Sequence, residues 1–240
     1  MSAARPNQSA ATDDFEFAAL REASNYRAAL VREFGAYLQG SVLEIGAGIG
    51  HITSQLAGLP AVHKLVSVEP SPAFCRAFRE RMPQQALIEG TIADVDRHEP
   101  WEAILSINVL EHIRDDGPEL TEYRQRLKAA RGHLCLFVPA RPESYAPIDR
   151  DFGHYRRYTK TDLSGKLDAA GFDIVTLHYF NCVGYLAWWL NFRVLGKRHF
   201  DVGAVRWFDR AIFPPVHWCE SRLCRPPIGQ SLLAVAAARP

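Results

Sequence analysis

The stretch VLEIGAGIG, at residues 42–50, decides the fold of this 240-residue chain. Its apolar first half is typical of a buried β-strand, and its three glycines lead into a helical pattern over residues 51–57. Glycine lets the backbone turn sharply and approach a ligand closely, because it has no Cβ atom. A helix that follows directly points its free N–H groups and its positive dipole end at the ligand. The stretch therefore predicts a strand–loop–helix nucleotide site.

Strand patterns and helical patterns alternate along the chain on both sides of this stretch. The predicted strands cover residues 42–45, 65–68, 86–88, 103–107, 133–138, 172–179 and 231–238. The predicted helices cover residues 13–38, 51–57, 72–81, 118–132 and 159–171. This alternation predicts a doubly wound, Rossmann-like α/β sheet. Right-handed crossovers then bring the strand ends at Gly46, Glu69, Gly90 and Asn108 to one edge of the sheet.

Two segments late in the chain depart from this alternation. Residues 140–158 form a polar, aromatic loop that is too long for a simple connection, and residues 181–227 are rich in aromatic side chains. We predict that both segments cap the substrate side of a single domain over residues 13–240. Residues 1–12 are polar and alanine-rich, which predicts a flexible tail and not a signal peptide.

The composition is that of an ordinary globular protein, with 48% hydrophobic and 23% charged residues and a net charge of +1. So small a net charge gives no reason to expect a nucleic-acid partner. No apolar run reaches the roughly 18 residues that predict a transmembrane helix. The five cysteines follow no regular spacing, so we expect free thiols in a reducing cytoplasm. Cys219, Cys224 and nearby His217 suggest a metal site only weakly, and we predict no metal.

Two acidic residues distinguish between the possible nucleotides. The glycine loop reads Glu44-x-Gly46-x-Gly48-x-Gly50, whereas dinucleotide sites of dehydrogenases space their glycines as G-x-G-x-x-G. A carboxylate at Glu44 repels a pyrophosphate but attracts an ammonium or sulfonium group. Glu69, at the end of the second strand, can accept hydrogen bonds from both ribose hydroxyls of NAD or of any free adenosyl group.

Four segments together resemble class I S-adenosylmethionine-dependent methyltransferases. They are VLEIGAGIG (42–50), VSVEPS (66–71), EGTIADV (89–95) and AILSINVLEHI (103–113), in the order that the family has them. The LEH tripeptide at residues 110–112 is similar to the small-molecule branch that includes quinone-biosynthesis-type methyltransferases. The resemblance implies a seven-stranded sheet with an antiparallel last strand and helical cap insertions. It also implies S-adenosylmethionine as cofactor and a small-molecule hydroxyl, amine or carboxylate as methyl acceptor.

The same resemblance implies where the cofactor-binding residues lie. Glu44 and the glycine loop belong at the methionine end, Glu69 at the ribose, and the end of the third strand at the adenine. The implied residues are Glu44, Gly46, Ala47, Gly48, Gly50, Glu69, Pro70, Thr91, Ile92, Asn108, Val109, Leu110 and Tyr26. Family members often carry Asp where Thr91 stands, which leaves adenine recognition to backbone groups or to Asp94. Tyr26 either closes over the cofactor or packs between its helix and the sheet.

Candidate catalytic residues follow from the chemistry of methyl transfer. The reaction needs alignment and exclusion of water, and it needs a general base only where the acceptor must lose a proton. His112 follows the fourth strand and is the first candidate base, although Glu111 and His112 could instead hold their loop in place. His154 is the second candidate base, and Arg157 could hold a carboxylate or phosphate. An ion-pair network that stiffens residues 140–158 would explain the same side chains.

An aromatic stripe at helical spacing lies in the second late segment. Its members are Tyr185, Trp188, Trp189, Phe192 and Leu195, and basic residues follow at 197–199. Such a stripe favours packing or a substrate lid over a dimer contact, and a dimer contact over a membrane surface. An aromatic-lined cap suits an apolar or ring-containing acceptor. We expect a monomer or a homodimer.

Two other functions fit parts of the pattern. An NAD(P)-dependent oxidoreductase also uses a glycine-rich loop after the first strand, although Glu44 and the tighter glycine spacing count against it. A non-catalytic relative of the methyltransferase fold could bind the cofactor and act as a partner subunit.

Overall fold

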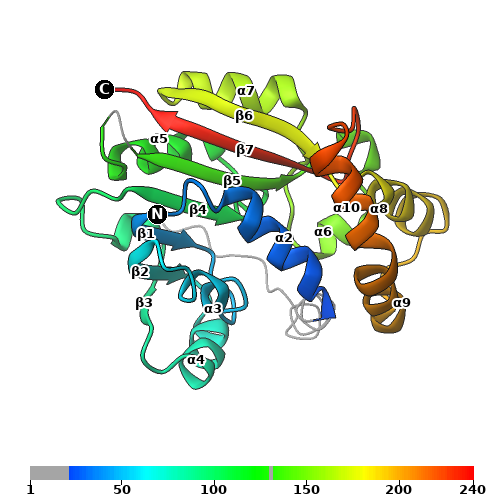
Figure 1. Cartoon of the computed structure of the whole chain (residues 1–240), viewed down its shortest axis with the longest axis horizontal. Helices are drawn as coiled ribbons and strands as arrows, with labels where there is room; N and C mark the ends of the chain where they lie inside the picture. Colours follow the sequence, from blue (N-terminus) through cyan, green and yellow to red (C-terminus); the bar gives the residue numbers. More distant parts are fainter. Residues whose placement is uncertain (1–21, 130–131) are drawn as a thin grey trace.

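The computed structural model describes residues 22–129 and 132–240. The predicted tail 1–12 and the first part of the predicted helix 13–38 lie outside these residues. The described chain forms a seven-stranded sheet in the order β3-β2-β1-β4-β5-β7-β6 (Figure 1). Its strands are β1 (Gly40–Ile45), β2 (Val62–Glu69), β3 (Ala86–Glu89), β4 (Ala103–Ile107), β5 (His133–Pro139), β6 (Phe172–Phe180) and β7 (Ser231–Ala238). All seven predicted strands are confirmed, with ends that move by no more than a few residues.

The strand directions confirm the predicted doubly wound sheet with an antiparallel last strand. β7 runs antiparallel to both β5 and β6, whereas β3, β2, β1, β4 and β5 pair in parallel. The chain order along the sheet reverses between β1 and β4, which are direct neighbours with Ile45 opposite Ser106. In such sheets a ligand binds outside the carboxyl ends of the strands at this reversal.

Helices cover both faces of the sheet and bury two separate apolar clusters. They include α2 (Ser24–Phe34), α3 (Thr53–Leu56), α4 (Pro72–Arg81), α5 (Asp116–Arg126) and α7 (Lys160–Ala169). Leu43 and Ile45 of β1 pack in the cluster that contains Leu120 of α5, while Val42 packs in the cluster that contains Phe34 of α2. This alternation follows from the two-residue period of a strand, and it holds β1 rigidly in the centre.

Local sequence signals explain two of the helices well. α4 begins after Ser71, whose hydroxyl accepts a hydrogen bond from the Phe74 N–H at 3.5 Å, and Pro72 occupies the first helical position. α7 begins after Thr159, whose hydroxyl accepts a bond from the Asp162 N–H at 3.1 Å. The predicted bounds of α4 are confirmed, and the helix predicted to start at Thr159 has Thr159 as its N-cap.

Three predicted helices are shorter by several residues in the structure. The helix expected over residues 13–38 ends at Phe34. The helix expected over residues 51–57 has only one turn, at Thr53–Leu56, so its dipole adds little to the site. The helix expected to close at Gly132 ends at Arg126 instead. There Leu127 leaves the helix and forms a parallel bridge with Trp101, which sets the end of the helix.

The two late segments are helical and gather at one end of the sheet (Figure 1). Residues 140–158 contain η3 (Pro142–Ser144) and α6 (Pro147–Asp151). The other segment contains α8 (Cys182–Trp188), η4 (Trp189–Val194), α9 (Val202–Trp207), η5 (Phe208–Ile212) and α10 (Phe213–Arg222). η4 is a π-helix, and η3 is a 3₁₀-helix.

The predicted aromatic stripe divides between two faces in the structure. Trp188 and Phe192 are buried against Ile148 and Phe152 of the first segment. Trp189 and Leu195 are instead 44% and 59% exposed. The prediction of a single stripe was therefore wrong. Trp189 follows Trp188 directly and so points about 100° away from it around a helix. The π-helix that begins at Trp189 alters the spacing at which Leu195 would share the buried face. The inner half of the stripe joins the two late segments into one cap.

Asp209 of η5 anchors α2 to this cap. Its buried carboxylate accepts bonds from the backbone N–H groups of Asn25 and Tyr26 at 3.0 and 2.9 Å and from the Asn25 side chain at 3.2 Å. These N–H groups belong to the first turn of α2, which has no partners within the helix for them.

All five cysteines are free thiols, as expected. Among the described residues, no helix is long and apolar enough to span a membrane.

We predict that Asp209→Ala lowers the free energy of unfolding by about 3 kcal/mol, because three N–H donors lose a charged, buried acceptor. Asp201→Ala is the matched control, since Asp201 caps α9 through the Ala204 N–H but is exposed. The control substitution should lower the free energy of unfolding by only about 1 kcal/mol. Urea unfolding of both variants measures the difference, and equal small losses would contradict the anchoring role of Asp209.

Candidate active site

The glycine loop is fixed to the ends of three neighbouring strands. The N–H groups of Gly46 and Ala47 both donate to the carbonyl of Val68, at the end of β2, at 2.9 and 3.1 Å. Gly46 has a φ of +76°, and a Cβ atom there would lie 2.3 Å from a methyl group of Val109, which follows β4. Only glycine therefore lets the β1 loop turn against both neighbouring strand ends at once.

Glu69 ties the glycine loop to the end of β2. One carboxylate oxygen accepts the Gly48 N–H at 2.9 Å, and the other accepts the Ser71 N–H at 2.8 Å. Pro70 lies between these two contacts in the chain. A carboxylate can accept more than two hydrogen bonds, so these two contacts are compatible with further bonds from ribose hydroxyls. The position expected for a ribose acceptor is thus built into the loop itself.

Glu44 is a buried carboxyl group beneath the same loop. Its Oε2 atom accepts bonds from the Thr53 hydroxyl at 2.6 Å and from the Ser67 hydroxyl at 2.8 Å. Burial raises the pKa of Glu44 to about 7, although these two hydrogen bonds oppose the shift. A cationic group bound above the loop would favour the ionised carboxylate. The structure thus places Glu44 where a positively charged ligand would gain from it.

The end of β3, where the adenine is expected, is a turn held by the Asp94 side chain. The Asp94 carboxylate accepts the Thr91 N–H at 2.8 Å and closes a capping box over η1 (Ile92–Asp94). Asp94 therefore holds its own turn together. Ile92 is buried, and its carbonyl accepts a bond from Arg126 at 3.0 Å. Thr91 remains exposed at the strand end.

The end of β4 carries Asn108, Val109 and Leu110 as the sequence predicted. Asn108 has a φ of +52° and donates its N–H to the Phe137 carbonyl of β5 at 2.9 Å. Leu110 is fully buried and begins η2 (Leu110–His112). This short helix turns the chain away from the sheet and places His112 beyond the strand ends.

Tyr26 packs between α2 and the sheet, as one of its two alternatives states. Its ring contacts Phe137, Phe180 and Phe213, with ring centroids 6.2, 5.4 and 5.1 Å apart. Such edge-to-face and tilted contacts are typical of an aromatic core. These contacts account for Tyr26 without a role in closing over the cofactor.

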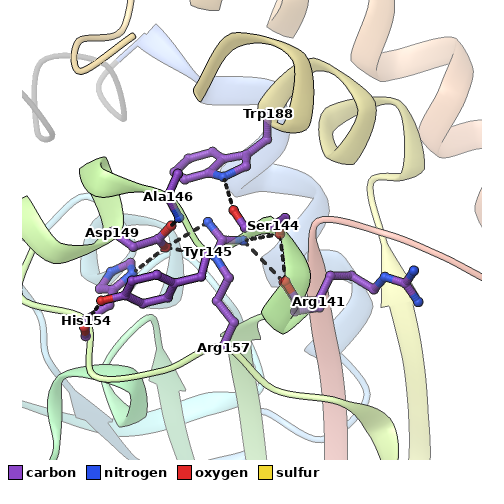
Figure 2. A network of polar contacts seen from close by, with 9 residues as sticks. Arg141, Ser144, Tyr145, Ala146, Asp149, His154, Arg157 and Trp188 are labelled. Atoms are coloured by element: carbon purple, nitrogen blue, oxygen red, sulfur yellow. Dashed lines mark hydrogen bonds and ion pairs between the residues drawn. The ribbon is translucent and has the colours of Figure 1, made fainter. Parts of the chain in front are cut away.

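Asp149 organises the polar residues of the cap (Figure 2). Its Oδ1 atom lies 3.0 Å from Nδ1 of His154 and 2.8 Å from Nε of Arg157, while Oδ2 accepts the Ala146 N–H at 2.8 Å. Burial alone would raise the pKa of Asp149, but the His154 bond and the Arg157 charge outweigh it and hold the pKa below its usual value. Asp149 is therefore an ionised acceptor with no donor of its own.

The Arg157 side chain makes its polar and ring contacts with residues of the cap itself. Its guanidinium contacts Asp149, donates to the Ala140 carbonyl at 3.2 Å, and lies 4.4 Å from the centre of the Trp188 ring. The Trp188 N–H in turn donates to the carbonyl of Ser144 at 3.2 Å (Figure 2). These contacts match the ion-pair network considered for residues 140–158. They leave the predicted role of Arg157 in holding an acceptor anion without support.

His112 and His154, the two candidate bases, come together in the structure. Their ring centroids lie 4.7 Å apart with the rings nearly perpendicular. His154 is far from His112 in sequence, yet the N–H of Tyr155 donates to the carbonyl of Glu111 at 2.8 Å and joins the two segments. A buried carboxylate, Glu111, lies in the same group of side chains. This group is the acceptor-side cluster, defined as Glu111, His112 and His154.

Comparison with known proteins decides the family. A model described as a methyltransferase domain matches residues 16–177, which is more than half of the chain. The chain belongs to this methyltransferase family. With the seven-stranded topology described above, it is a class I methyltransferase with S-adenosylmethionine as cofactor. The alternative of an NAD(P)-dependent oxidoreductase is therefore not retained.

Solved structures show the same fold at low sequence identity. A suspected methyltransferase from Bacillus halodurans C-125 is 20% identical, with a TM-score of 0.59 over 89% of this chain and 99% of that chain. An S-adenosylmethionine-dependent methyltransferase from Clostridium acetobutylicum is 10% identical, with a TM-score of 0.60 over 90% and 92%. A chain from the complex of the Haloferax volcanii Trm112 activator with a suspected methyltransferase is 14% identical, with a TM-score of 0.64 over 99% and 100%. No curated protein matches the chain in sequence.

Two other features of the methyltransferase lie apart from this site. Cys219 and Cys224 are exposed, and His217 faces Glu33 at 3.8 Å. Within the described ranges these three residues do not form a group whose ligand atoms lie close together. A cavity between α2 and α10 is lined by Asn25, Arg32, Phe213, Pro214, His217, Trp218, Ser221 and Arg222. None of the predicted site residues lines it.

Sequence reasoning missed several residues that position the site. Thr53 and Ser67 hold Glu44, and their hydroxyls carry no signal in the sequence that distinguishes them from surface residues. Asp149 lies in the polar segment 140–158 and was not predicted as a site residue, yet it contacts both His154 and Arg157. Partners of this kind become visible only when the fold brings separate segments together.

The raised pKa of Glu44 predicts a pH-dependent loss of stability in the methyltransferase without cofactor. Between about pH 4.5 and 7 the folded protein holds a proton that the unfolded chain releases, so stability is present below about pH 4.5 and is lost as the pH rises through about 7. We expect the free energy of unfolding to fall by about 3 kcal/mol over this range relative to Glu44→Gln. Urea unfolding from pH 4.5 to 8 measures this, and parallel curves for the two proteins would refute the shift.

Proposed function

We propose that this methyltransferase transfers a methyl group from S-adenosylmethionine to a hydroxyl, amine or carboxylate of a small-molecule acceptor. When bound, the cofactor supplies an electrophilic methyl group on a sulfonium sulfur. We assign the methionine end to the glycine loop above Glu44, and the ribose to Glu69. Support comes from Glu44 on β1, which borders the reversal of strand order, and from Glu69 at the end of β2, which accepts the Gly48 N–H of the loop after β1.

One observation carries the proposal. The two oxygens of Glu69 accept the N–H groups of Gly48 and Ser71, which fixes the carboxylate at the end of β2. A carboxylate held in this way binds two vicinal hydroxyls without losing side-chain freedom. The buried, hydroxyl-bonded carboxyl of Glu44 lies beside it and would stabilise a cation, not a phosphate. This pair of acids suits an adenosyl sulfonium ligand.

We place the acceptor at the acceptor-side cluster of Glu111, His112 and His154. The cluster follows the end of β4, the strand that neighbours β1 and its cofactor loop. A hydroxyl or ammonium acceptor must lose its proton before or during the transfer, and imidazole and carboxylate groups are suited to removing it. We therefore propose that deprotonation of the acceptor depends on this cluster.

The cap favours an apolar or ring-containing acceptor. Phe152, Trp188, Phe192 and Phe200 pack together beside residues 146–148, and the Phe152 ring lies 5.9 Å from that of His154. Aromatic side chains next to a few fixed polar groups are typical of pockets for small molecules that are mostly apolar. The neighbouring aromatic cluster thus supports the proposed acceptor class.

The direct test is methyl transfer from labelled S-adenosylmethionine to a fractionated extract of small metabolites. We expect label in one or a few organic compounds, and none in added tRNA or protein. A protein that binds the cofactor but transfers no label to metabolites, nucleic acid or protein would support the alternative of a non-catalytic partner subunit.

We predict that Glu69→Ala weakens binding of S-adenosylhomocysteine about 100-fold, because two charge-assisted hydrogen bonds to the ribose are lost. Glu80→Ala is the matched control, since Glu80 is an exposed glutamate on α4. Calorimetric titration should give an unchanged dissociation constant for the control. Equal affinities of wild type and Glu69→Ala would refute the ribose assignment.

We predict that His154→Ala and His112→Ala each slow single-turnover methyl transfer by at least about 100-fold. Their dissociation constants for S-adenosylhomocysteine should remain within about twofold of wild type, since the cofactor is held by other residues. His63→Ala is the control, because His63 is exposed on β2. A full transfer rate in both cluster variants would remove the cluster from the mechanism.

A further inference from the structure

The acceptor-side cluster has the composition and spacing of a metal site. Glu111, His112 and His154 each offer one ligand atom, and these atoms all lie within 4.8 Å of one another. Ligand atoms around a tetrahedral ion with bonds of 2.0–2.2 Å are about 3.4 Å apart, so small side-chain rotations would suffice to close the site. Among residues 22–129 and 132–240, this is the one group of three metal-ligating side chains at such spacing.

His154 is oriented as a metal-binding histidine. Its Nδ1 atom lies 3.0 Å from Oδ1 of Asp149, and the same carboxylate accepts bonds from the Ala146 N–H and from the Arg157 guanidinium. A carboxylate surrounded by these donors acts as an acceptor toward His154 as well, so we assign the proton to Nδ1. The Nε2 atom is then a bare lone pair. It is buried and has no hydrogen-bond partner within the described part of the chain. Metal-ligating histidines in proteins usually donate their other N–H to a carboxylate or carbonyl in this manner.

The surroundings of the cluster also favour a cation. Glu111 is a completely buried carboxylate, and the His154 side chain is only 8% exposed. The ring of Phe152 adds an apolar wall 5.9 Å from the His154 ring. An apolar shell of this kind limits the access of water to a site, and it strengthens the attraction between a carboxylate and a cation bound there. His112 is half-buried, which leaves the cluster open on one side.

We propose that Glu111, His112 and His154 bind one divalent transition-metal ion, with Asp149 as the outer partner of His154. Two imidazole nitrogens and one carboxylate oxygen suit Zn²⁺, Fe²⁺, Co²⁺ or Mn²⁺ better than Mg²⁺ or Ca²⁺, which prefer oxygen ligands. Three protein ligands leave at least one coordination position for another molecule. The site would therefore be of the open, catalytic type.

The metal site deepens the proposed function and rests on it for its role. The open position would take the reacting oxygen of a hydroxyl acceptor and lower the pKa of that hydroxyl, whose proton leaves to water. The acceptor oxygen then forms a bond to the methyl carbon as the carbon–sulfur bond breaks, and the electron pair of that bond remains on sulfur. Charge balances, because the sulfonium becomes a neutral thioether and the alkoxide becomes a neutral ether.

Cobalt titration tests the site independently of methyl transfer. The chelator-treated, full-length protein is titrated with Co²⁺ and followed by visible absorption, and Zn²⁺ is then added in competition. We expect one Co²⁺ per chain and displacement by Zn²⁺. His154→Ala and His112→Ala should each weaken Co²⁺ binding by about 100-fold or more, since loss of an outer-shell partner alone typically costs 10–100-fold. His63→Ala should bind Co²⁺ as wild type does.

The controls separate this proposal from the proposed function. Binding of S-adenosylhomocysteine to each variant shows that the fold is intact. Substoichiometric Co²⁺ binding, binding unchanged in both cluster variants, or binding lost in Cys219→Ser instead would overturn the metal site. Metal-free protein that transfers methyl groups at the full rate would overturn its role and leave the proposed function standing. Absent cofactor binding together with normal Co²⁺ binding would refute the proposed function alone.

Discussion

The double hydrogen bond of the Glu69 carboxylate is the constraint on which the cofactor side of this enzyme depends. It joins the Gly48 N–H of the β1 loop to the Ser71 N–H at the start of α4. The loop is also held by the Val68 carbonyl and by the close approach of Val109 to Gly46. Because these contacts come from β1, β2 and β4, the site is preorganised at the point where the strand order reverses.

The proposed acceptor side depends on a second buried acid, Asp149. It holds His154 and Arg157 at once, and Arg157 in turn stacks against Trp188 of α8. The two late segments are therefore tied into one cap by a charge-assisted network around an apolar cluster. A cap built in this way positions His154 beside His112, although the two residues lie in different segments of the chain.

Sequence patterns predicted the sheet and the cofactor side because those signals are local. Strand periodicity, the glycine loop and the Ser71-Pro72 helix start each depend on neighbouring residues, and each is confirmed. The predicted end of α5 at Gly132 was wrong. A bridge between Leu127 and Trp101, which are distant in sequence, ends the helix at Arg126.

The cap was less predictable for the same physical reason. The exposure of Leu195 depends on a π-helix whose onset no simple periodicity shows. The anchoring of α2 by Asp209 joins residues 184 positions apart.

The assignments of Glu44, Glu69 and the strand ends to parts of the cofactor remain predictions, now with positions that are compatible with them.

Amide hydrogen exchange with and without S-adenosylhomocysteine tests the central claim most directly, because it reports where the ligand binds. The account predicts slower exchange at residues 46–50 and at Ser71 when the ligand is present. Unchanged exchange there, with protection instead at Asn25 and along α10 beside the cavity between α2 and α10, would contradict the placement of the cofactor at the strand reversal.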